Sequence, residues 1–531
     1  IALNAMFRPG PMENIPSFCA RKHGREAVSY PHPLLESVLG ETYGIMVYQE
    51  QVMQAAQVLG GYSLGGADLL RRAMGKKKAE EMAEHREIFR SGAAGKGISA
   101  AVADEVFDLM EKFAGYGFNK SHAAAYSLLA YHTAWIKVHC SAEFFAANLT
   151  VESDDTDKLR VLWNDAKAFG VELLAPDVNR GMHRFEPVSD TSIEYGLGAI
   201  KGTGQGAIQA IVAARDDGGP FKSLFDFCAR VDRQRINKRV VEALIKAGAF
   251  DALHPDRAAM LASVGLAIDW AETQAVHANQ GGLFDFGPDD AASHAASTLE
   301  PPLVAVAAWS IRERLGFEKA ALGFFMSGHL FDQNADEVRQ FARRAIADLI
   351  DSREPQLLAG IVGDLRIVNG QRGRVAIFKL DDKSDAIESV VAEELLNANK
   401  DLLKDDELII VEGKVQPDRF SGGVRLNISQ LWGLAEARCR FGKHLRIELG
   451  ATMPPVDQLI SEFPARRKAG EHGESVAGLA VRLVVQRSNA RAEIDLGADG
   501  RFFPSDEALS RWLAASAGQA KVVYELSRNN P

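Results

Sequence analysis

Cysteine is scarce in this sequence, and the cysteines that occur form no pattern. There are four, Cys19, Cys140, Cys228 and Cys439, and they lie far apart with no paired spacing. This argues against a zinc site or a disulfide framework and is typical of a protein from a reducing cytoplasm. Long apolar runs are also missing, since none approaches the roughly 20 residues that span a bilayer, and no signal-peptide pattern opens the chain. We therefore expect a cytoplasmic protein without a membrane partner.

An excess of positive charge is missing as well, although contacts to nucleic-acid phosphates require Lys and Arg. The 531 residues carry a formal net charge of −10. The charge is unevenly distributed, because residues 197–250 hold 9 Lys or Arg against 5 Asp or Glu, whereas residues 251–354 hold 8 against 16. The acidity is thus concentrated in one segment, and the net charge does not exclude binding to DNA.

What is present is a change of periodicity along a chain long enough for about three or four domains. Residues 1 to about 180 repeat apolar side chains at helical spacing, whereas from about residue 355 the period approaches two. The segments that predict strands are Leu357–Val362, Arg374–Leu380, Glu407–Val415 and Gly423–Ile428, with one internal helix over Val390–Leu402. This pattern predicts a small oligonucleotide-binding (OB-type) β-barrel within a multidomain α+β protein.

The segment Gly115-Tyr-Gly-Phe-Asn-Lys-Ser-His122 leads directly into a predicted helix. The glycines on both sides of Tyr116 free the backbone, and Lys120, Ser121 and His122 fall where the helix starts. A helix N-terminus beside a cation favours phosphate. A second segment, Leu70-Arg-Arg-Ala-Met-Gly-Lys-Lys-Lys78, has five cations among the eight residues after Leu70 and is either a phosphate-binding cluster or a solvated basic helix end.

These two segments, read as whole strings, resemble the fingers of the bacterial DNA polymerase III alpha subunit, a C-family replicative polymerase. Three further segments carry the resemblance: Phe7-Arg-Pro-Gly-Pro11, Arg21-Lys-His-Gly-Arg25 and Tyr43-Gly-Ile-Met-Val-Tyr-Gln-Glu-Gln-Val-Met53. The resemblance runs in order through nearly the whole chain. It is densest from residue 1 to about 250 and looser after 430.

The resemblance implies a DNA-directed DNA polymerase, a nucleotidyltransferase of DNA replication, whose fingers bind the triphosphate of the incoming deoxynucleotide. The residues that it assigns to this nucleotide are Arg71, Arg72, Lys76, Tyr116, Asn119, Lys120, Ser121 and His122.

In the family, palm aspartates hold the catalytic Mg²⁺ ions. No segment here matches the palm motif, because Asp155 and Asp157 lie in a polar turn that suits helix capping. Since the chain opens with Ile1, we expect a C-terminal part of a longer protein that is inactive alone, with no catalytic or metal-binding residue of its own.

The resemblance also implies a division into domains. Residues 1–180 would be partial fingers, 181–270 a tandem helix-hairpin-helix region, 271–305 a linker with a sliding-clamp motif, 306–354 a helical connector, 355–435 the OB-fold, and 436–531 a C-terminal domain similar to the one that binds the clamp-loader tau subunit. A proofreading exonuclease subunit is a possible partner of the region upstream of Ile1.

The segment Lys201-Gly-Thr-Gly204 is a turn before a predicted helix. In a helix-hairpin-helix element, such a turn presents backbone N–H groups to a phosphate of primer-template DNA. An ordinary turn is the alternative interpretation of Lys201, Gly202, Thr203 and Gly204. The second hairpin of the pair would be Lys246-Ala-Gly-Ala249.

The expected linker contains Gln280-Gly-Gly-Leu-Phe284, which resembles a sliding-clamp motif with Gln280, Leu283 and Phe284 as its anchors. The alternative is that its apolar side chains pack on a neighbouring domain. In the barrel, Arg372 and Arg374 would contact single-stranded template, and Phe378 is either a stacking base or part of the core. His132 and His139 share one helix but lack a third ligand, so we expect no metal site there.

Two other function classes remain open from the sequence. One is an error-prone, accessory C-family polymerase, against which the clamp motif and the string Asn119-Lys-Ser-His122 both argue. The other is a non-catalytic adaptor that tethers DNA to a clamp.

Overall fold

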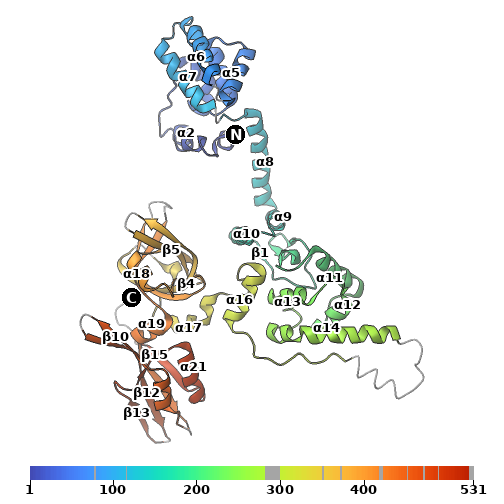
Figure 1. The fold of residues 1–531 in the computed structure, drawn as a ribbon, viewed down its shortest axis with the longest axis vertical. Coiled ribbons are helices and arrows are strands. Elements are labelled where there is room, and N and C mark those ends of the chain that lie inside the picture. Colours follow the sequence, from blue (N-terminus) through green and yellow to red (C-terminus); the bar gives the residue numbers. More distant parts are fainter. Residues whose placement is uncertain are drawn as a thin grey trace. The chain divides into compact units, whose positions relative to one another are not determined.

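The structure is a computed structural model that describes residues 1–76, 79–114, 117–280, 299–349, 352–370, 373–417, 423–450, 453–470, 473–487 and 489–524. The chain divides into two compact units. The first unit comprises Ile1–Asn148, Asn164–Glu172 and Pro187–Ile193, and the second comprises Leu149–Trp163, Leu173–Glu186 and Glu194–Pro531. Figure 1 shows the elements of both units coloured along the sequence.

The first unit is helical, as its periodicity predicts. Its helices are α1 (Ala2–Met6), α2 (Ile15–Lys22), α3 (Glu36–Leu39), α4 (Gln49–Gly60), α5 (Leu64–Lys76), α6 (Ala79–Ala94), α7 (Ala100–Ala114) and α8 (Lys120–His139), with short 3-10 turns at Pro11–Asn14, Pro33–Leu35 and Gly40–Thr42. The division between the units runs through α9 (Ser141–Val151), α10 (Thr156–Ala168) and the short strands β1 (Glu172–Leu173), β2 (Glu186–Ser189) and β3 (Ser192–Glu194).

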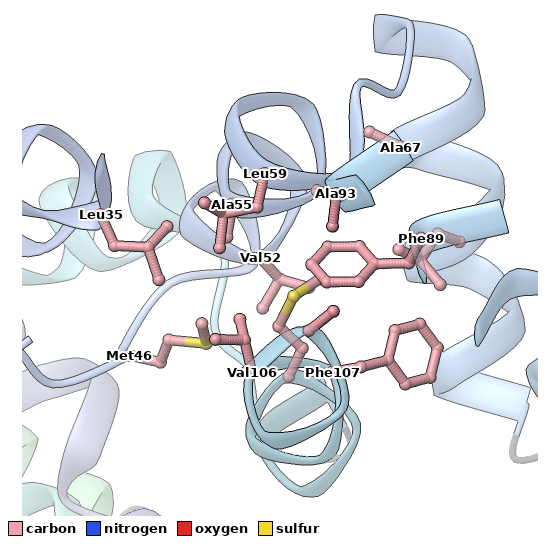
Figure 2. Close-up of a cluster of buried hydrophobic side chains, with 14 of the residues drawn as sticks. Leu35, Met46, Val52, Ala55, Leu59, Ala67, Phe89, Ala93, Val106 and Phe107 are labelled. Atoms are coloured by element: carbon pink, nitrogen blue, oxygen red, sulfur yellow. The ribbon is translucent and has the colours of Figure 1, made fainter. Parts of the chain in front are cut away.

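The core of the first unit lies among α4, α5, α6 and α7. Phe89 of α6 and Phe107 of α7 are completely buried there, with their ring centroids 5.6 Å apart (Figure 2). Helices α4 and α6 cross at two glycines, because a Cβ on Gly92 would lie 1.8 Å from the carbonyl oxygen of Gly60. This close crossing fixes α4, whose first turn carries much of the site described below.

The second unit opens with helices. They are α11 (Gln205–Gly218), α12 (Leu224–Arg230), α13 (Lys238–Lys246), α14 (Arg257–Gln280), α16 (Ile311–Leu322) and α17 (Ala335–Val338), with 3-10 turns at Leu197–Ala199, Leu330–Gln333 and Ile346–Asp348. Helix α14 packs against both α12 and α13. Helix α14 continues to Gln280, so residues 271–280, which were predicted to lie in a linker, are helical.

A closed β-barrel follows, as the two-residue period predicts. Its strands β4 (Ser352–Gly370), β5 (Gly373–Asp381), β6 (Ala386–Val391), β7 (Leu408–Pro417) and β8 (Val424–Trp432) close in the order β4-β5-β6-β8-β7. The helix α18 (Glu393–Ala398) joins β6 to β7. Phe378 is 2% exposed inside the barrel, so it belongs to the core rather than to a stacking surface.

One barrel strand differs from the prediction. The internal helix was expected from Val390, whereas β6 runs through Val391 and α18 begins at Glu393. Alternate residues Ile387, Ser389 and Val391 are buried in β6. The buried Ser389 breaks the apolar alternation that would have indicated a strand.

The C-terminal region is a mixed sheet with helices. Its sheet has the order β13-β12-β9-β15, in which β12 and β9 are parallel. The elements are α19 (Leu434–Phe441), β9 (Gly442–Leu449), α20 (Val456–Glu462), β10 (Arg466–Gly470), β11 (Gly473–Ala477), β12 (Leu479–Gln486), β13 (Arg491–Asp495), β14 (Arg501–Phe502), α21 (Asp506–Ala515) and β15 (Ala520–Tyr524). Trp512 of α21 and Phe502 of β14 are completely buried in its core.

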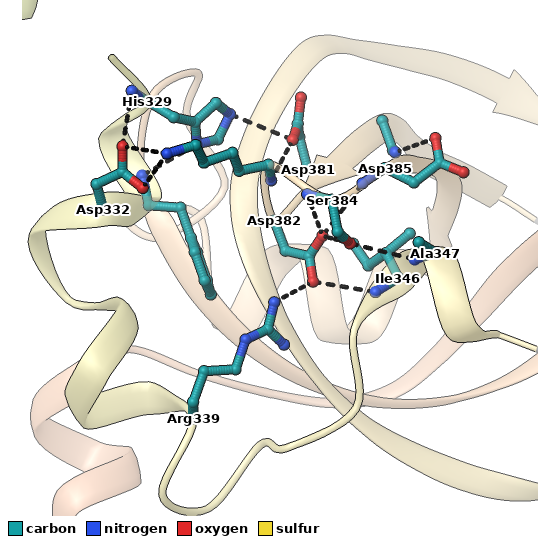
Figure 3. Close-up of polar contacts among 12 residues, drawn as sticks. His329, Asp332, Arg339, Ile346, Ala347, Asp381, Asp382, Ser384 and Asp385 are labelled. Carbon is teal, nitrogen blue, oxygen red and sulfur yellow. Dashed lines mark hydrogen bonds and ion pairs between the residues drawn. The ribbon is translucent and has the colours of Figure 1, made fainter.

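A buried carboxylate joins the barrel to the segment before it. Asp382, which follows β5, accepts hydrogen bonds from Ser384, from the guanidinium of Arg339 and from the backbone N–H of Ile346 (Figure 3). Burial alone would raise the pKa of Asp382, but these hydrogen bonds and the charge of Arg339 outweigh it, so the pKa lies below its ordinary value. The carboxylate is therefore charged at neutral pH and holds the connector onto the barrel.

Candidate nucleic-acid interface

Arg71 and Arg72 lie together on α5 and share one carboxylate. Asp68 accepts hydrogen bonds on Oδ1 from Nε and Nη2 of Arg71, at 3.0 and 2.8 Å. Its Oδ2 lies 2.8 Å from Nη2 of Arg72. The spacing i, i+3 and i+4 places all three side chains on one helix face. The hydrogen bond and charge of Arg71, with the charge of Arg72, lower the pKa of Asp68.

The turn before α8 is held by the first turn of α4. The backbone N–H of Gln49 donates to the carbonyl oxygen of Phe118 at 3.0 Å. A Cβ on Gly117 would lie 3.0 Å from Cγ of Gln49, so the turn packs tightly against α4. Oε1 of Gln49 is also 3.5 Å from Nη1 of Arg71. Gln49 therefore brings the arginine pair and the turn into one site.

The N-terminus of α8 is capped by two side chains. Asn119 Oδ1 accepts from the backbone N–H of His122 at 2.8 Å, and its Nδ2 donates to Glu50 Oε1 at 2.9 Å. Both oxygens of Glu50 accept from the backbone N–H of Lys120, at 3.1 and 3.0 Å. The phosphate-binding N-terminus expected from the sequence thus has a carboxylate of the same chain on its first amide group.

The side chains that follow Asn119 point to different partners. Lys120 Nζ donates to both oxygens of Glu41 at 2.7 Å and lies 5.5 Å from the centroid of the Tyr48 ring. Burial first, and then the charges of Glu41 and Glu50, raise the pKa of Tyr48 to about 12. Ser121 and His122 are exposed.

Two of the nucleotide-binding predictions fall outside the description. Tyr116 is not among the described residues, and of Lys76 only the backbone, at the end of α5, is described. The described residues Arg71, Arg72, Asn119 and Lys120 are brought together through Gln49, Glu50 and Asp68. Sequence reasoning missed these three partners, although Asp68 could have been found from its i, i+3 and i+4 spacing to the arginines.

The turn at Lys201–Gly204 has the geometry of a hairpin before a helix. Gly202 has φ +91°, a backbone conformation that favours glycine, and Gly204 is the N-cap of α11. Thr203 Oγ1 donates to the carbonyl oxygen of Leu197 or of Ile200, at 2.8 and 2.7 Å, which fixes the turn. In the part of the chain that the structure describes, the amides of Gly202, Gly204 and Gln205 have no hydrogen-bond acceptor.

Exposed cations lie beside this turn. A Cβ on Gly206 would lie 3.9 Å from Nη1 of Arg235. A Cβ on Gly202 would lie 3.8 Å from Ala243, which is one helical turn after Arg239 on α13. Among the described residues, Lys201, Arg235 and Arg239 are exposed and form no ion pair. Arg235 and Arg239 contribute to the positive charge of residues 197–250, but the sequence did not indicate that they belong to this site.

The turn of the second expected hairpin is buried inside the protein and is not exposed to solvent. Gly248 has φ +86°, is buried, and its N–H donates to the carbonyl oxygen of Ile245 at 3.0 Å. A Cβ there would lie 2.3 Å from Nη2 of Arg257, whose buried guanidinium bonds both oxygens of Asp251 and also Glu318. This turn therefore has a packing role in the structure.

The remaining sequence-based predictions are spread over other parts of the chain. In the barrel, Arg374 pairs with Glu393 at 3.1 Å, and Arg372 lies outside the described residues. Leu283 and Phe284 lie outside them too, and of Gln280 only the backbone is described. Asp155 accepts from the N–H of Lys158 at 3.1 Å and so acts as a helix cap. No described helix is long and apolar enough to cross a bilayer.

Two family models match the chain. Residues 1–97 match the bacterial DNA polymerase III alpha subunit finger domain, and residues 170–260 match a helix-hairpin-helix motif. The first match covers α4 and α5 with the arginine pair, and the second covers the Lys201–Gly204 turn. The class is therefore that of bacterial DNA polymerase alpha subunits.

Curated relatives make the assignment specific. The DNA polymerase III subunit alpha of Neisseria meningitidis serogroup B is 51% identical over 85% of this chain and 39% of its own length. The subunits of Vibrio cholerae and Escherichia coli K12 are 43% and 42% identical, each over 99% of this chain and over 46% and 45% of their own lengths. The chain belongs to the DNA polymerase III alpha subunit family. It spans less than half the length of these relatives.

Proposed function

We propose that this chain is the nucleotide- and DNA-gripping part of a DNA-directed DNA polymerase that transfers nucleotides to the 3′ end of a primer. The observation that carries the proposal is the convergence of Arg71 and the 117–122 turn on the first turn of α4, with Arg72 joined to Arg71 through Asp68. Two guanidinium groups and one ammonium group there form a cationic site of the kind that a triphosphate requires. The membership in the alpha subunit family supports the same interpretation.

The chemistry that these cations perform is electrostatic. In nucleotidyl transfer, negative charge develops on the leaving pyrophosphate, and fixed cations that face it lower the barrier. Arg71 and Arg72 can each bind phosphate oxygens with two parallel N–H donors, whereas Lys120 acts as a point charge. Tyr116, Asn119 and His122 would shape the pocket around the nucleotide, with Lys76 and Ser121 near the phosphates.

Magnesium ions would assist the same transfer in this proposal, and we assign them no ligand among the described residues of this chain. Among the described residues, no group of three or more His, Cys, Asp or Glu side chains is arranged to hold a metal. His132 and His139 therefore remain without a third ligand there. The proposed Mg²⁺ ligands lie in a palm domain, and we assign none of them to residues 1–531.

DNA binding is the second role that we propose for the chain. The free amides of the Lys201–Gly204 turn, with Arg235 and Arg239 beside it, suit the phosphate backbone of a primer-template duplex. Such a site reads no sequence, as a replicative enzyme requires. The barrel would add single-stranded template through Arg372 and Arg374.

Protein partners complete the proposal. The segment Gln280–Phe284 would bind the sliding clamp, and the C-terminal region would bind the clamp-loader tau subunit. A proofreading exonuclease subunit would be a further partner of the whole polymerase subunit. A non-catalytic tether of DNA to a clamp is the rival function, and only the nucleotide site separates it from the polymerase, because a tether has no use for a triphosphate.

The decisive experiment is therefore a calorimetric titration of the 531-residue chain with inorganic tripolyphosphate and Mg²⁺. Arg71→Ala should weaken binding about tenfold or more, since charge-assisted hydrogen bonds to phosphate are lost. Lys112→Ala, which removes one exposed positive charge from α7, is the matched control and should change little. Equal affinities of the parent chain and the Arg71→Ala variant would refute the nucleotide role and favour the tether.

A further inference from the structure

Arg71, Arg72 and Lys120, the cations of the proposed nucleotide site whose side chains the structure describes, are each bound to a carboxylate of the same chain. Asp68 bridges Arg71 and Arg72 with three contacts of 2.8–3.0 Å. Glu41 receives two hydrogen bonds of 2.7 Å from Lys120. By contrast, the cations beside the Lys201–Gly204 turn have no such partner among the described residues. Carboxylate partners are thus found at the triphosphate site, and at Arg374 of the barrel, which pairs with Glu393, but not at every proposed phosphate-binding surface.

We propose that Asp68 is the internal counter-anion of the nucleotide site: its carboxylate holds Arg71 and Arg72 before the nucleotide arrives, and the phosphates of the nucleotide then displace it. This inference rests on the proposed nucleotide role of the two arginines. It adds a residue that sets the affinity of the site, with Glu41 acting in the same way on Lys120.

The geometry allows this exchange. The side chain of Asp68 is 31% exposed and that of Arg72 is 62% exposed, so the ion pairs lie at the surface. Ion pairs between solvent-exposed side chains contribute little to stability, so they are readily exchanged. A triphosphate brings several negative charges and more acceptor oxygens than one carboxylate, so it competes well for the same N–H donors.

The carboxylate also prepares the site. Asp68 binds Nε and Nη2 of Arg71, and Gln49 lies at Nη1, so the guanidinium has one orientation before phosphate binds. Fixing a long side chain in advance reduces the entropy cost of binding. The same carboxylate cancels one of two positive charges, which lowers the attraction for any anion.

Glu50 differs from Asp68 and Glu41. It accepts from the backbone N–H of Lys120 and the amide of Asn119, so it caps α8, and among the described side chains it pairs with no cation of the site. We therefore expect Glu50 to stay in place when the nucleotide binds. This separates a structural carboxylate from two exchangeable ones within the same site.

The test is a calorimetric titration of the full 531-residue chain with inorganic tripolyphosphate and Mg²⁺ at low salt. Asp68→Asn keeps the size of the side chain and removes its charge. We expect the variant to bind about fivefold more tightly, because one negative charge beside the phosphates is lost. The gain should shrink at high salt, where surface charges are screened.

Two controls make the result specific. Asp104→Asn removes a carboxylate that pairs with Arg90 and Arg86 elsewhere in the same helical unit, and it should leave the affinity unchanged. Asp68→Ser is a second variant that lacks the charge, and it should also bind more tightly. Thermal unfolding followed by circular dichroism checks that both variants are folded.

The outcomes separate this inference from the function on which it rests. If Arg71→Ala weakens binding but Asp68→Asn leaves it unchanged or weaker, the nucleotide role stands and the counter-anion does not. Weaker binding would mean that Asp68 positions the arginines in the bound state. If Arg71→Ala has no effect, or the parent chain binds no tripolyphosphate, the nucleotide site itself is refuted.

Discussion

At the scale of single residues, the buried ion pair between Arg257 and Glu318 has more structural weight than the surface pairs. Their side chains are 4% and 1% exposed, and Arg257 Nη1 lies 3.3 Å from Glu318 Oε1. Glu318 Oε2 also accepts from the backbone N–H groups of Met326 and Ser327, at 2.7 and 2.9 Å. The carboxylate of Glu318 thus joins α16 to α14 and to the segment that follows α16.

Removing that carboxylate should be costly. Glu318→Ala leaves two amide groups without their acceptor and removes one of the two carboxylates that pair with the buried guanidinium of Arg257. The free energy of unfolding should therefore fall by about 3 kcal/mol or more. Chemical denaturation followed by the fluorescence of the second unit measures this loss. Glu313→Ala, at an exposed N-terminal position of the same helix, is the comparison and should cost about 1 kcal/mol or less through lost capping. Equal losses for the two variants would show that burial of the pair is unimportant.

A site residue could be recognised from the sequence only where its neighbours in the site are also its neighbours along the chain. Arg71 and Arg72 were found because adjacent cations and their string are visible in the chain itself. Glu41 was not singled out, because its pairing with Lys120 joins residues that are far apart in sequence and meet only through tertiary structure. Arg239 was missed for the same reason, since it lies one helical turn from Ala243, the residue of α13 that packs near Gly202.

At the scale of elements, the first hairpin and the second hairpin do different work. Both turns contain a glycine with positive φ, and in both sequences that glycine closely follows a lysine. The first has exposed amides, whereas the second is closed by the buried guanidinium of Arg257. Sequence alone could not separate the two, because what covers a turn is decided by elements that come later in the chain.

The cations beside the first hairpin should therefore carry much of the affinity for duplex DNA. Changing Arg235 and Arg239 together to Gln should weaken binding and reduce the slope of log K against log salt by about one for each phosphate that is no longer neutralised. Lys238→Gln is the matched control on α13, since Lys238 lies 3.9 Å from the carboxylate of Glu242 and is in part neutralised. Fluorescence anisotropy at several salt concentrations measures both quantities. An unchanged slope in the double variant would exclude these cations from the interface.

The strands show where periodicity succeeds and where it fails. Four of the five barrel strands follow from alternation, because their inward residues are apolar. The fifth, β6, carries Ser389 at a buried position and directly precedes a helix, so its pattern merges with that of α18. An alternating pattern is recognised only where the buried side chains are apolar. A small polar residue can also be buried in a strand, and the pattern then does not indicate the strand.

At the scale of the whole molecule, each unit has a hydrophobic core of its own. Phe107 lies in the cluster of α4 to α7, and Phe378 lies in the cluster of the barrel, with no residue common to both. Core clusters that share no residues can unfold separately, so a single unfolding transition is not the expected behaviour of such a chain.

Two matched variants test this independence. Phe107→Ala and Phe378→Ala each remove a buried ring and should each cost about 3–5 kcal/mol in their own core. Differential scanning calorimetry should then show two transitions in the parent chain, with each variant lowering the midpoint of a different one by several degrees. Both substitutions remove a phenylalanine ring from a buried site, so they should be about equally destabilising. A shift that is confined to one transition would therefore report which core the ring belongs to. A common transition that both variants lower together would mean that the units unfold as one cooperative structure, and the nucleotide and DNA sites would then share their stability.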